Sequence, residues 1–199
     1  MAIENGVPTV PTVFLLSPAN LAGARAAQLL APDAGFETAV RYRSAEGVPI
    51  AEAYSFVSSL YFRGKIAYAR RFAAEERILV IAPGVGLVPP DWRLTSERLT
   101  ALRTPVDLKN PGYCDPLSAH AHELRAAMPE AGRVVLLGSV ATGKYVDLLR
   151  PVFGDRLLFP REFAGMGDMQ RGAVLLRAAR EGRELEYATL DAPRRRARS

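Results

Sequence analysis

The segment VVLLGSVATGKY, which ends at Tyr145, places residues that could bind a phosphate group directly after an apolar run. Its glycines and Lys144 follow the spacing of a nucleotide-binding loop, in which backbone amides and a lysine surround the phosphates. Such a loop needs a serine or threonine after the lysine to bind magnesium, whereas Tyr145 holds its hydroxyl too far out. The sequence therefore disfavours a nucleotide hydrolase. It keeps Gly138, Ser139 and Lys144 as candidates for lining a ligand crevice at the end of a strand.

A second glycine-rich segment, FPREFAGMGDMQRG, lies directly before a helical pattern. Gly165 and Gly167 could leave backbone amides free to face a phosphate or a polar base edge. Arg161 and Arg171 could add bidentate contacts to such a group, with Glu162 beside the first of them. The alternative hypothesis is a turn eased by glycine, with its charged side chains on the surface.

A third candidate is the stripe formed by Tyr61, Lys65 and Tyr68, at spacings of four and three in a helix predicted over residues 58–73. An aromatic and basic stripe can stack bases and hold phosphates. The competing interpretation makes the tyrosines half-buried at a helix boundary, with the basic groups reaching outward.

The candidate proton-transfer groups are carboxylates in predicted loops: Asp91, Glu162 and Asp168. Without a neighbouring histidine, such a carboxylate would act alone or through water. His120 and His122 stand two residues apart on a predicted helix and so point to different faces, which argues against a metal pair and a catalytic dyad. We therefore expect no metal site and no cofactor.

Four short, continuous apolar runs predict the strands that position these residues, at residues 10–16, 78–82, 134–137 and 157–159. Continuous runs suit strands buried on both faces, so we expect an α/β fold, a three-layer α/β/α sandwich with a mainly parallel central sheet. Residues 184–190 alternate in polarity and suit a sheet edge. Ser17 is expected to cap a helix directly after the first strand.

Turns that follow parallel strands open on one edge of the sheet, where such folds bind ligands. Ser17, Asn20, Gly84 and Gly86 belong to two of these turns, and Asn20 could orient water or a base edge. The stretch 103–115 is broken by proline and glycine, so we expect a surface excursion there.

Composition bounds the classes of protein that remain. The chain of 199 residues suits one domain, residues 1–190, followed by a basic tail at 191–199 that carries +3 of the net charge of +5. The single cysteine, Cys114, cannot form an internal disulfide. No apolar run reaches eighteen residues, so we expect no membrane span and a cytoplasmic protein. The sequence leaves the oligomeric state open.

Four segments in order, SSLYFRGKIAYARRFA, ILVIAPGVGLVPPD, VVLLGSVATGKYVDLLRPVF and FPREFAGMGDMQRGAVLLR, resemble the bacterial and phage domain family DUF6884 over residues 55–180. That family and the YaaA family of peroxide-stress proteins look related to the uracil-DNA glycosylase-like fold. By position, Ser17, Pro18 and Asn20 would match a loop that carries the water-activating carboxylate or asparagine in that fold. Other matched positions are Gly138 and Ala141 in a strand-helix unit, and Phe159, Pro160 and Arg161 in a His-Pro-Ser segment.

Two departures limit what the resemblance implies. Phe159 replaces the histidine that would support charge on a departing base, and the SPAN loop has no carboxylate to activate water. The resemblance therefore implies a base-binding pocket more strongly than a working uracil glycosylase.

Three hypotheses follow. The first is a protein that recognises a nucleobase, nucleoside or nucleic acid and, if it is an enzyme, acts on N-glycosidic bonds with Asn20, Asp91 or Asp168. The second is a non-enzymatic DNA- or RNA-binding protein whose affinity comes from the tail and the stripe of Tyr61, Lys65 and Tyr68. The third is a small-molecule transferase that holds a phosphate in the Gly165–Gly172 loop.

Overall fold

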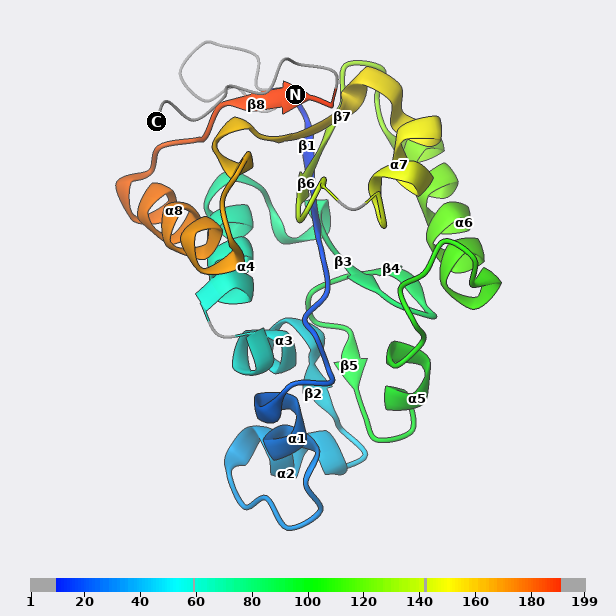
Figure 1. Cartoon of the computed structure of the whole chain (residues 1–199), viewed down its shortest axis with the longest axis vertical. Helices are drawn as coiled ribbons and strands as arrows, with labels where there is room; N and C mark the ends of the chain where they lie inside the picture. Colours follow the sequence, from blue (N-terminus) through cyan, green and yellow to red (C-terminus); the bar gives the residue numbers. More distant parts are fainter. Residues whose placement is uncertain (1–9, 59, 142, 191–199) are drawn as a thin grey trace.

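The computed structural model describes residues 10–58, 60–141 and 143–190, which form a mixed α/β structure around a six-stranded sheet (Figure 1). The sheet order is β4-β3-β1-β6-β7-β8, in which β1, β3, β6 and β7 are parallel and the edge strands β4 and β8 are antiparallel. The strands are β1 (Thr12–Leu16), β3 (Ile78–Ala82), β4 (Gly86–Val88), β6 (Arg133–Leu137), β7 (Leu157–Pro160) and β8 (Tyr187–Thr189). The predicted tail at 191–199 lies outside the described residues.

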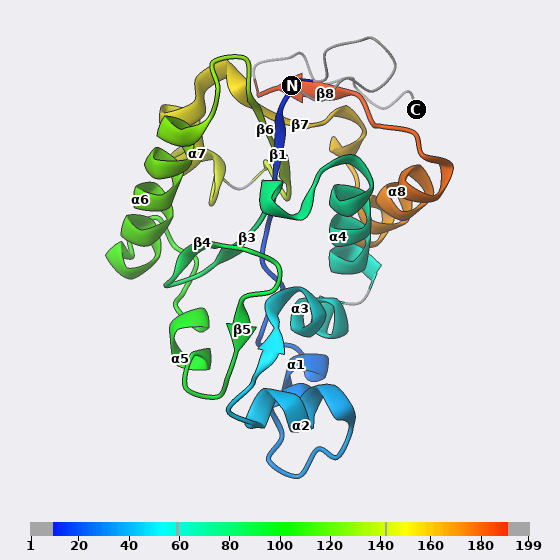
Figure 2. The same ribbon diagram turned by 180° about the vertical axis from the view of Figure 1, so that it is seen from behind.

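Helices cover both faces of the sheet, as Figure 1 and the reverse view in Figure 2 show. Phe14 and Leu16 of β1 enter one core with α1 (Ala24–Leu30), α2 (Glu37–Arg43), α3 (Ile50–Ser58), α4 (Leu60–Phe72), α5 (Leu99–Leu102) and α8 (Asp168–Glu181). Val13 and Leu15 enter the other core with α6 (Pro111–Ala127) and α7 (Val146–Phe153). The predicted α/β class and mainly parallel sheet are confirmed, and the layers are compatible with a three-layer sandwich.

Helices α4 and α8 pack against each other at a pair of glycines. A Cβ atom on Gly64 would lie 2.7 Å from the carbonyl oxygen of Gly172, and one on Gly172 would lie 2.8 Å from the carbonyl oxygen of Leu60. Contacts this short with backbone atoms cannot be relieved by a side-chain rotation. The two helices therefore approach closely only because both positions lack a side chain.

Several predicted elements need correction. Ser17 does not cap a helix, because α1 begins at Ala24 with Gly23 as its N-cap. The segment 103–115 is not all loop, since Asn110 caps α6 by accepting a hydrogen bond from the amide of Gly112. Helix α3 and the short pair β2 (Val48–Pro49) and β5 (Arg93–Leu94) were not predicted. The helix predicted over residues 58–73 corresponds to α4, and the predicted edge strand corresponds to β8.

None of the helices in the described part of the chain is both long enough and apolar enough to span a bilayer.

Candidate functional site

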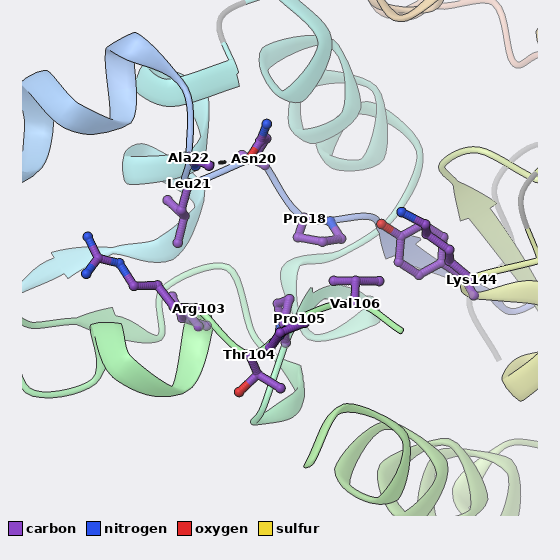
Figure 3. Close-up of a pocket in the computed structure, with 13 residues that line it drawn as sticks. Pro18, Asn20, Leu21, Ala22, Arg103, Thr104, Pro105, Val106 and Lys144 are labelled. Atoms are coloured by element: carbon purple, nitrogen blue, oxygen red, sulfur yellow. Dashed lines mark hydrogen bonds between the residues drawn. The ribbon is translucent and has the colours of Figure 1, made fainter. Parts of the chain in front are cut away.

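A hollow of about 720 Å³ lies where β1, β3 and β6 end (Figure 3). Three of the four predicted turns contribute to it, because parallel strands deliver their carboxyl ends to one edge of the sheet. The segment between α5 and α6 supplies the remaining wall. The lining residues are Pro18, Ala19, Asn20, Leu21, Ala22, Pro83, Leu102, Arg103, Thr104, Pro105, Val106, Lys144 and Tyr145.

The lining of this hollow mixes apolar and polar surface in about equal shares, and its charged side chains are positive. Two of its members, Arg103 and Lys144, are exposed cations, and no carboxylate is among the described residues that line it. Figure 3 shows these two side chains at opposite ends of the hollow, with Pro18, Pro105 and Val106 between them. A site of this kind favours a ligand that has a flat or apolar body and a negative charge.

Asn20 follows β1 in the hollow's wall, as the sequence predicted. Its Oδ1 accepts a hydrogen bond of 2.9 Å from the amide of Ala22, which fixes the turn after Pro18. The side-chain amide group of Asn20 remains a donor for a ligand's polar edge.

Lys144 and Tyr145 form the wall that follows β6. The hydroxyl of Tyr113 donates a 2.7 Å hydrogen bond to the carbonyl of Lys144, so helix α6 holds this loop. Burial and, to a smaller extent, the negative charge of Asp168 raise the pKa of the Tyr145 hydroxyl to about 12. Tyr145 is therefore a neutral phenol that can offer its ring face and its hydroxyl.

Lys65 lies behind this wall and is 1 % exposed. Its Nζ donates to the carbonyl oxygen of Ser17 at 2.7 Å and to the Ser17 hydroxyl at 2.8 Å. The Nζ also lies 4.2 Å from the centre of the Tyr61 ring. Burial lowers the pKa of the amine from 10.5 to about 7, while Asp168 opposes this shift and Arg171 adds to it.

The predicted stripe of Tyr61, Lys65 and Tyr68 is not a surface for bases. All three side chains are buried. Tyr68 accepts a hydrogen bond from the amide of Leu185 at 2.8 Å and shares one of 2.7 Å with the Tyr187 hydroxyl. The stripe therefore cannot supply affinity for nucleic acid, because the helix α4 turns this face toward the sheet and α8. It is more deeply buried than even the competing interpretation expected.

The glycine-rich segment after β7 lies outside the lining of the hollow. Gly167 begins α8, and its amide is capped by the Gln170 side chain at 3.1 Å. Gly165 has a positive φ of 78°, which explains a glycine there. Arg171 pairs with Asp168 at 3.3 Å and is 11 % exposed at its side chain. These groups join α8 to the region of Lys65 rather than forming an open phosphate loop.

Arg161 and Glu162 stand apart from the hollow as well. Arg161 pairs with Glu186 at 3.8 Å and lines a second, smaller hollow of about 400 Å³ beside β8. Glu162 has one buried carboxylate oxygen, Oε2, that finds no hydrogen-bond partner among the residues described by the structure.

The turn after β3 contributes Pro83 rather than the predicted glycines. Gly84 has a positive φ of 74° and packs against the backbone of Ala101, and Gly86 has no room for a side chain beside His120. Both glycines are explained by close packing. Asp91 is exposed in the turn that leads to β5 and does not line the hollow.

Gly138 and Ser139 directly follow β6 and lie next to the loop that follows β1. A Cβ atom on Gly138 would lie 2.8 Å from the Cβ of Ser17, so only glycine allows the two strand ends to approach this closely. Ser139 is half-buried and accepts a 3.4 Å hydrogen bond from Ala141.

Sequence reasoning missed the wall formed by residues 102–106. We predicted the segment from Arg103 onward to be a surface excursion. The signal that could have indicated otherwise is the Thr-Pro-Val sequence at 104–106, since proline holds the chain extended and Val106 is apolar.

No protein-family model, curated protein or solved structure matches this chain. The resemblance to DUF6884 therefore stays a prediction. Within the described ranges, no group of three or more histidine, cysteine, aspartate or glutamate side chains could hold a metal ion.

Proposed function

We propose that this protein binds a nucleobase-containing small molecule that carries a negative charge, such as a nucleoside monophosphate, in the hollow at the ends of β1, β3 and β6. The observation that carries the proposal is the lining itself. It combines a volume of about 720 Å³ with two cations at the rim and, among the described lining residues, no carboxylate. Small-molecule sites in open parallel sheets have this position and this size.

Each part of such a ligand can contact residues of suitable chemistry in the walls of the hollow. The ring of Tyr145 and the apolar surfaces of Pro18 and Pro83 suit a planar base. The side-chain amide of Asn20 suits a polar base edge. Lys144 and Arg103 attract a phosphate from either end of the hollow. The uracil-DNA glycosylase-like version of the fold belongs to this proposal, supported by four parallel strands with helices on both faces.

The test is thermal unfolding and calorimetric titration with nucleoside monophosphates. A ligand at a hundred times its Kd stabilises the folded protein by about 2.7 kcal/mol. We expect Lys144→Ala to weaken binding about three- to tenfold, whereas Lys109→Ala, at an exposed lysine outside the hollow, leaves it unchanged. Equal affinity in the two variants would remove Lys144 from the site, and no stabilisation by any mononucleotide would end the proposal.

Binding of a polynucleotide through the basic tail is the competing function. Deleting residues 191–199 removes a charge of +3. The proposal predicts that mononucleotide binding survives this deletion. Loss of all binding, together with a steep salt dependence in the full chain, would instead favour the nucleic-acid hypothesis.

We propose Asp168 as the carboxylate for N-glycosidic chemistry at this site, acting through water because it does not itself line the hollow. Its charge raises the pKa of Tyr145, a residue of the hollow's wall, and its side chain is 69 % exposed. The exposed Asp91 serves as the matched control, because it lies outside the hollow as Asp168 does but is not among the charges that shift the pKa of Tyr145. Asp168→Asn is expected to lower release of free base at least a hundredfold while mononucleotide affinity is retained, and Asp91→Asn to leave both unchanged. Equal base release by both variants and the parent chain would exclude Asp168.

A further inference from the structure

Lys65 is bonded to the one residue that joins two walls of the hollow. Both of its described hydrogen bonds go to Ser17, the residue directly before Pro18 in the wall that follows β1. The Ser17 hydroxyl donates to the carbonyl of Leu137 at 3.3 Å, and the Ser17 amide donates to the same oxygen at 3.2 Å. Leu137 ends β6, whose following loop carries Lys144 and Tyr145.

This junction is tightly built. Gly138 approaches Ser17 so closely that a Cβ atom would lie 3.0 Å from the serine hydroxyl oxygen. Helix α4 closes the third side, since the Lys65 amine lies between Ser17 and the rings of Tyr61 and Phe62, at 4.2 and 5.1 Å from their centres. A shift of the amine would therefore move the end of β1 relative to the end of β6.

Stability does not account for a lysine at this position. Burying an amine is unfavourable unless charges or several polar groups compensate it. The described hydrogen bonds of Lys65 reach only the two neutral oxygens of Ser17. The charge of Asp168 and the rings of Tyr61 and Phe62 offset the burial only in part, since the pKa of the amine stays lowered. A methionine of similar length would fill the same space among aromatic rings without that penalty. Polar groups retained against stability are typical of functional sites.

We propose that Lys65 is a positioning residue for the hollow: through Ser17 it fixes the wall at residues 18–22 against the wall at Lys144 and Tyr145, and so sets the affinity for the ligand. The inference takes its ligand from the proposed function, whereas the contacts of Lys65 are independent of that function. Lys65 does not line the hollow, so it acts on the ligand through Ser17.

The test compares Lys65→Met with Lys109→Met, its counterpart at an exposed lysine. Nucleoside monophosphate affinity is measured by calorimetry and stability by urea unfolding. We expect Lys65→Met to lower affinity about tenfold while the unfolding midpoint stays the same or rises, and Lys109→Met to change neither. Affinity that falls together with stability would overturn the proposal, as would unchanged affinity, because a merely structural lysine gives one of these two results.

Ser17→Ala provides a second variant in case the methionine protein does not fold. It removes the hydroxyl that accepts from Lys65 and keeps the carbonyl. We expect about a threefold loss of affinity, and less than the sum of the two single effects when it is combined with Lys65→Met, since both variants remove the hydrogen bond between Lys65 and the Ser17 hydroxyl. Fully additive losses would contradict the mechanism.

Amide hydrogen exchange separates failure of this inference from failure of the proposed function. We expect the peptide that covers residues 17–23 to exchange at least fivefold faster in Lys65→Met than in Lys109→Met, with no ligand present. This result supports the positioning role even if no mononucleotide binds, which would reject the proposed function alone. Equal exchange in the two proteins would reject the positioning role, whatever the ligand.

Discussion

The buried polar side chains at the two ends of helix α4 differ in how fully their hydrogen-bonding groups are satisfied. Near its C-terminal end, Tyr68 is buried with its hydroxyl satisfied by Leu185 and Tyr187, next to the edge strand β8. Near its N-terminal end, Tyr61 and Lys65 are buried. Within the described part of the chain the Tyr61 hydroxyl lies beside Arg171 without a well-formed hydrogen bond, and the Lys65 amine bonds only to Ser17. One helix thus carries a fully satisfied end and an end with unmet polar capacity.

This difference indicates which part of the molecule is optimised for stability and which part is not. Satisfied buried polar groups rigidify a core, whereas unsatisfied ones cost free energy and need another explanation. The unsatisfied end faces the strand ends that form the hollow, and the satisfied end faces away toward β8. The comparison therefore separates the scaffold from the candidate site within a single helix.

The largest expected loss of stability comes from disrupting the close glycine contact between helices α4 and α8. Gly172→Ala sets a Cβ atom within 2.9 Å of the carbonyl carbon of Leu60 and of the Cα atom of Tyr61. We expect a loss of about 3 kcal/mol in the free energy of unfolding, measured in urea. Gly35→Ala is the control, because this exposed glycine has no positive φ and no described atom within 4 Å of its Cβ position, so stability should change by less than about 0.5 kcal/mol. Similar losses in both would contradict the packing described here.

The pH dependence of the unfolding free energy tests the buried amine of Lys65, at the end of α4 where polar groups are unsatisfied. The pKa of Lys65 is about 7 in the folded protein and 10.5 as its ordinary value, so between these values the unfolded chain binds more protons. Stability should therefore rise from pH 7.5 to 9.5, by at most about 1.4 kcal/mol per pH unit from this group. Above pH 10 the buried tyrosines reverse the slope, since burial raises the pKa of Tyr61 and Tyr145 to about 12.

Lys65→Met removes this titration and serves as the control. The rise between pH 7.5 and 9.5 should be lost in this variant and kept in Lys109→Met. A rise of the same size in Lys65→Met would show that another group titrates in that window.

The smallest effects compare the two tyrosines directly. Tyr68→Phe leaves the amide of Leu185 and the hydroxyl of Tyr187 without their partner, so we expect a loss of about 1–2 kcal/mol in unfolding free energy. Tyr61→Phe removes a hydroxyl that lies beside Arg171 but makes no well-formed hydrogen bond within the described residues, so stability should change by less than about 0.5 kcal/mol or rise slightly. Equal losses would show that the two ends of α4 do not differ.

The layers of the fold could be predicted because buried parallel strands have a simple signature. The runs at residues 10–16 and 78–82 contain β1 and β3, the run at 134–137 covers β6 except for Arg133, and the run at 157–159 covers β7 except for Pro160. Each needs apolar side chains on both faces, which only a covered parallel sheet requires. Their shared direction also predicted the edge at which the hollow lies.

The roles of single side chains could not be predicted in the same way. Ser17 has the sequence of a helix cap, but its hydroxyl is taken by Lys65 and Leu137, which lie 48 and 120 residues away along the chain. From the sequence, Lys65 resembles a surface lysine, because no neighbouring residue in the chain indicates that α8 covers it. Local patterns report the conformation of the chain, whereas burial of a charged group depends on long-range packing.

The most direct test of the hollow as the ligand site is a crystal structure of the protein with a bound nucleoside monophosphate. The account predicts electron density for the base against Tyr145 and Pro18, with the phosphate toward Lys144 or Arg103. Density at the smaller hollow beside Arg161 and Glu186, or at the basic tail, would contradict it.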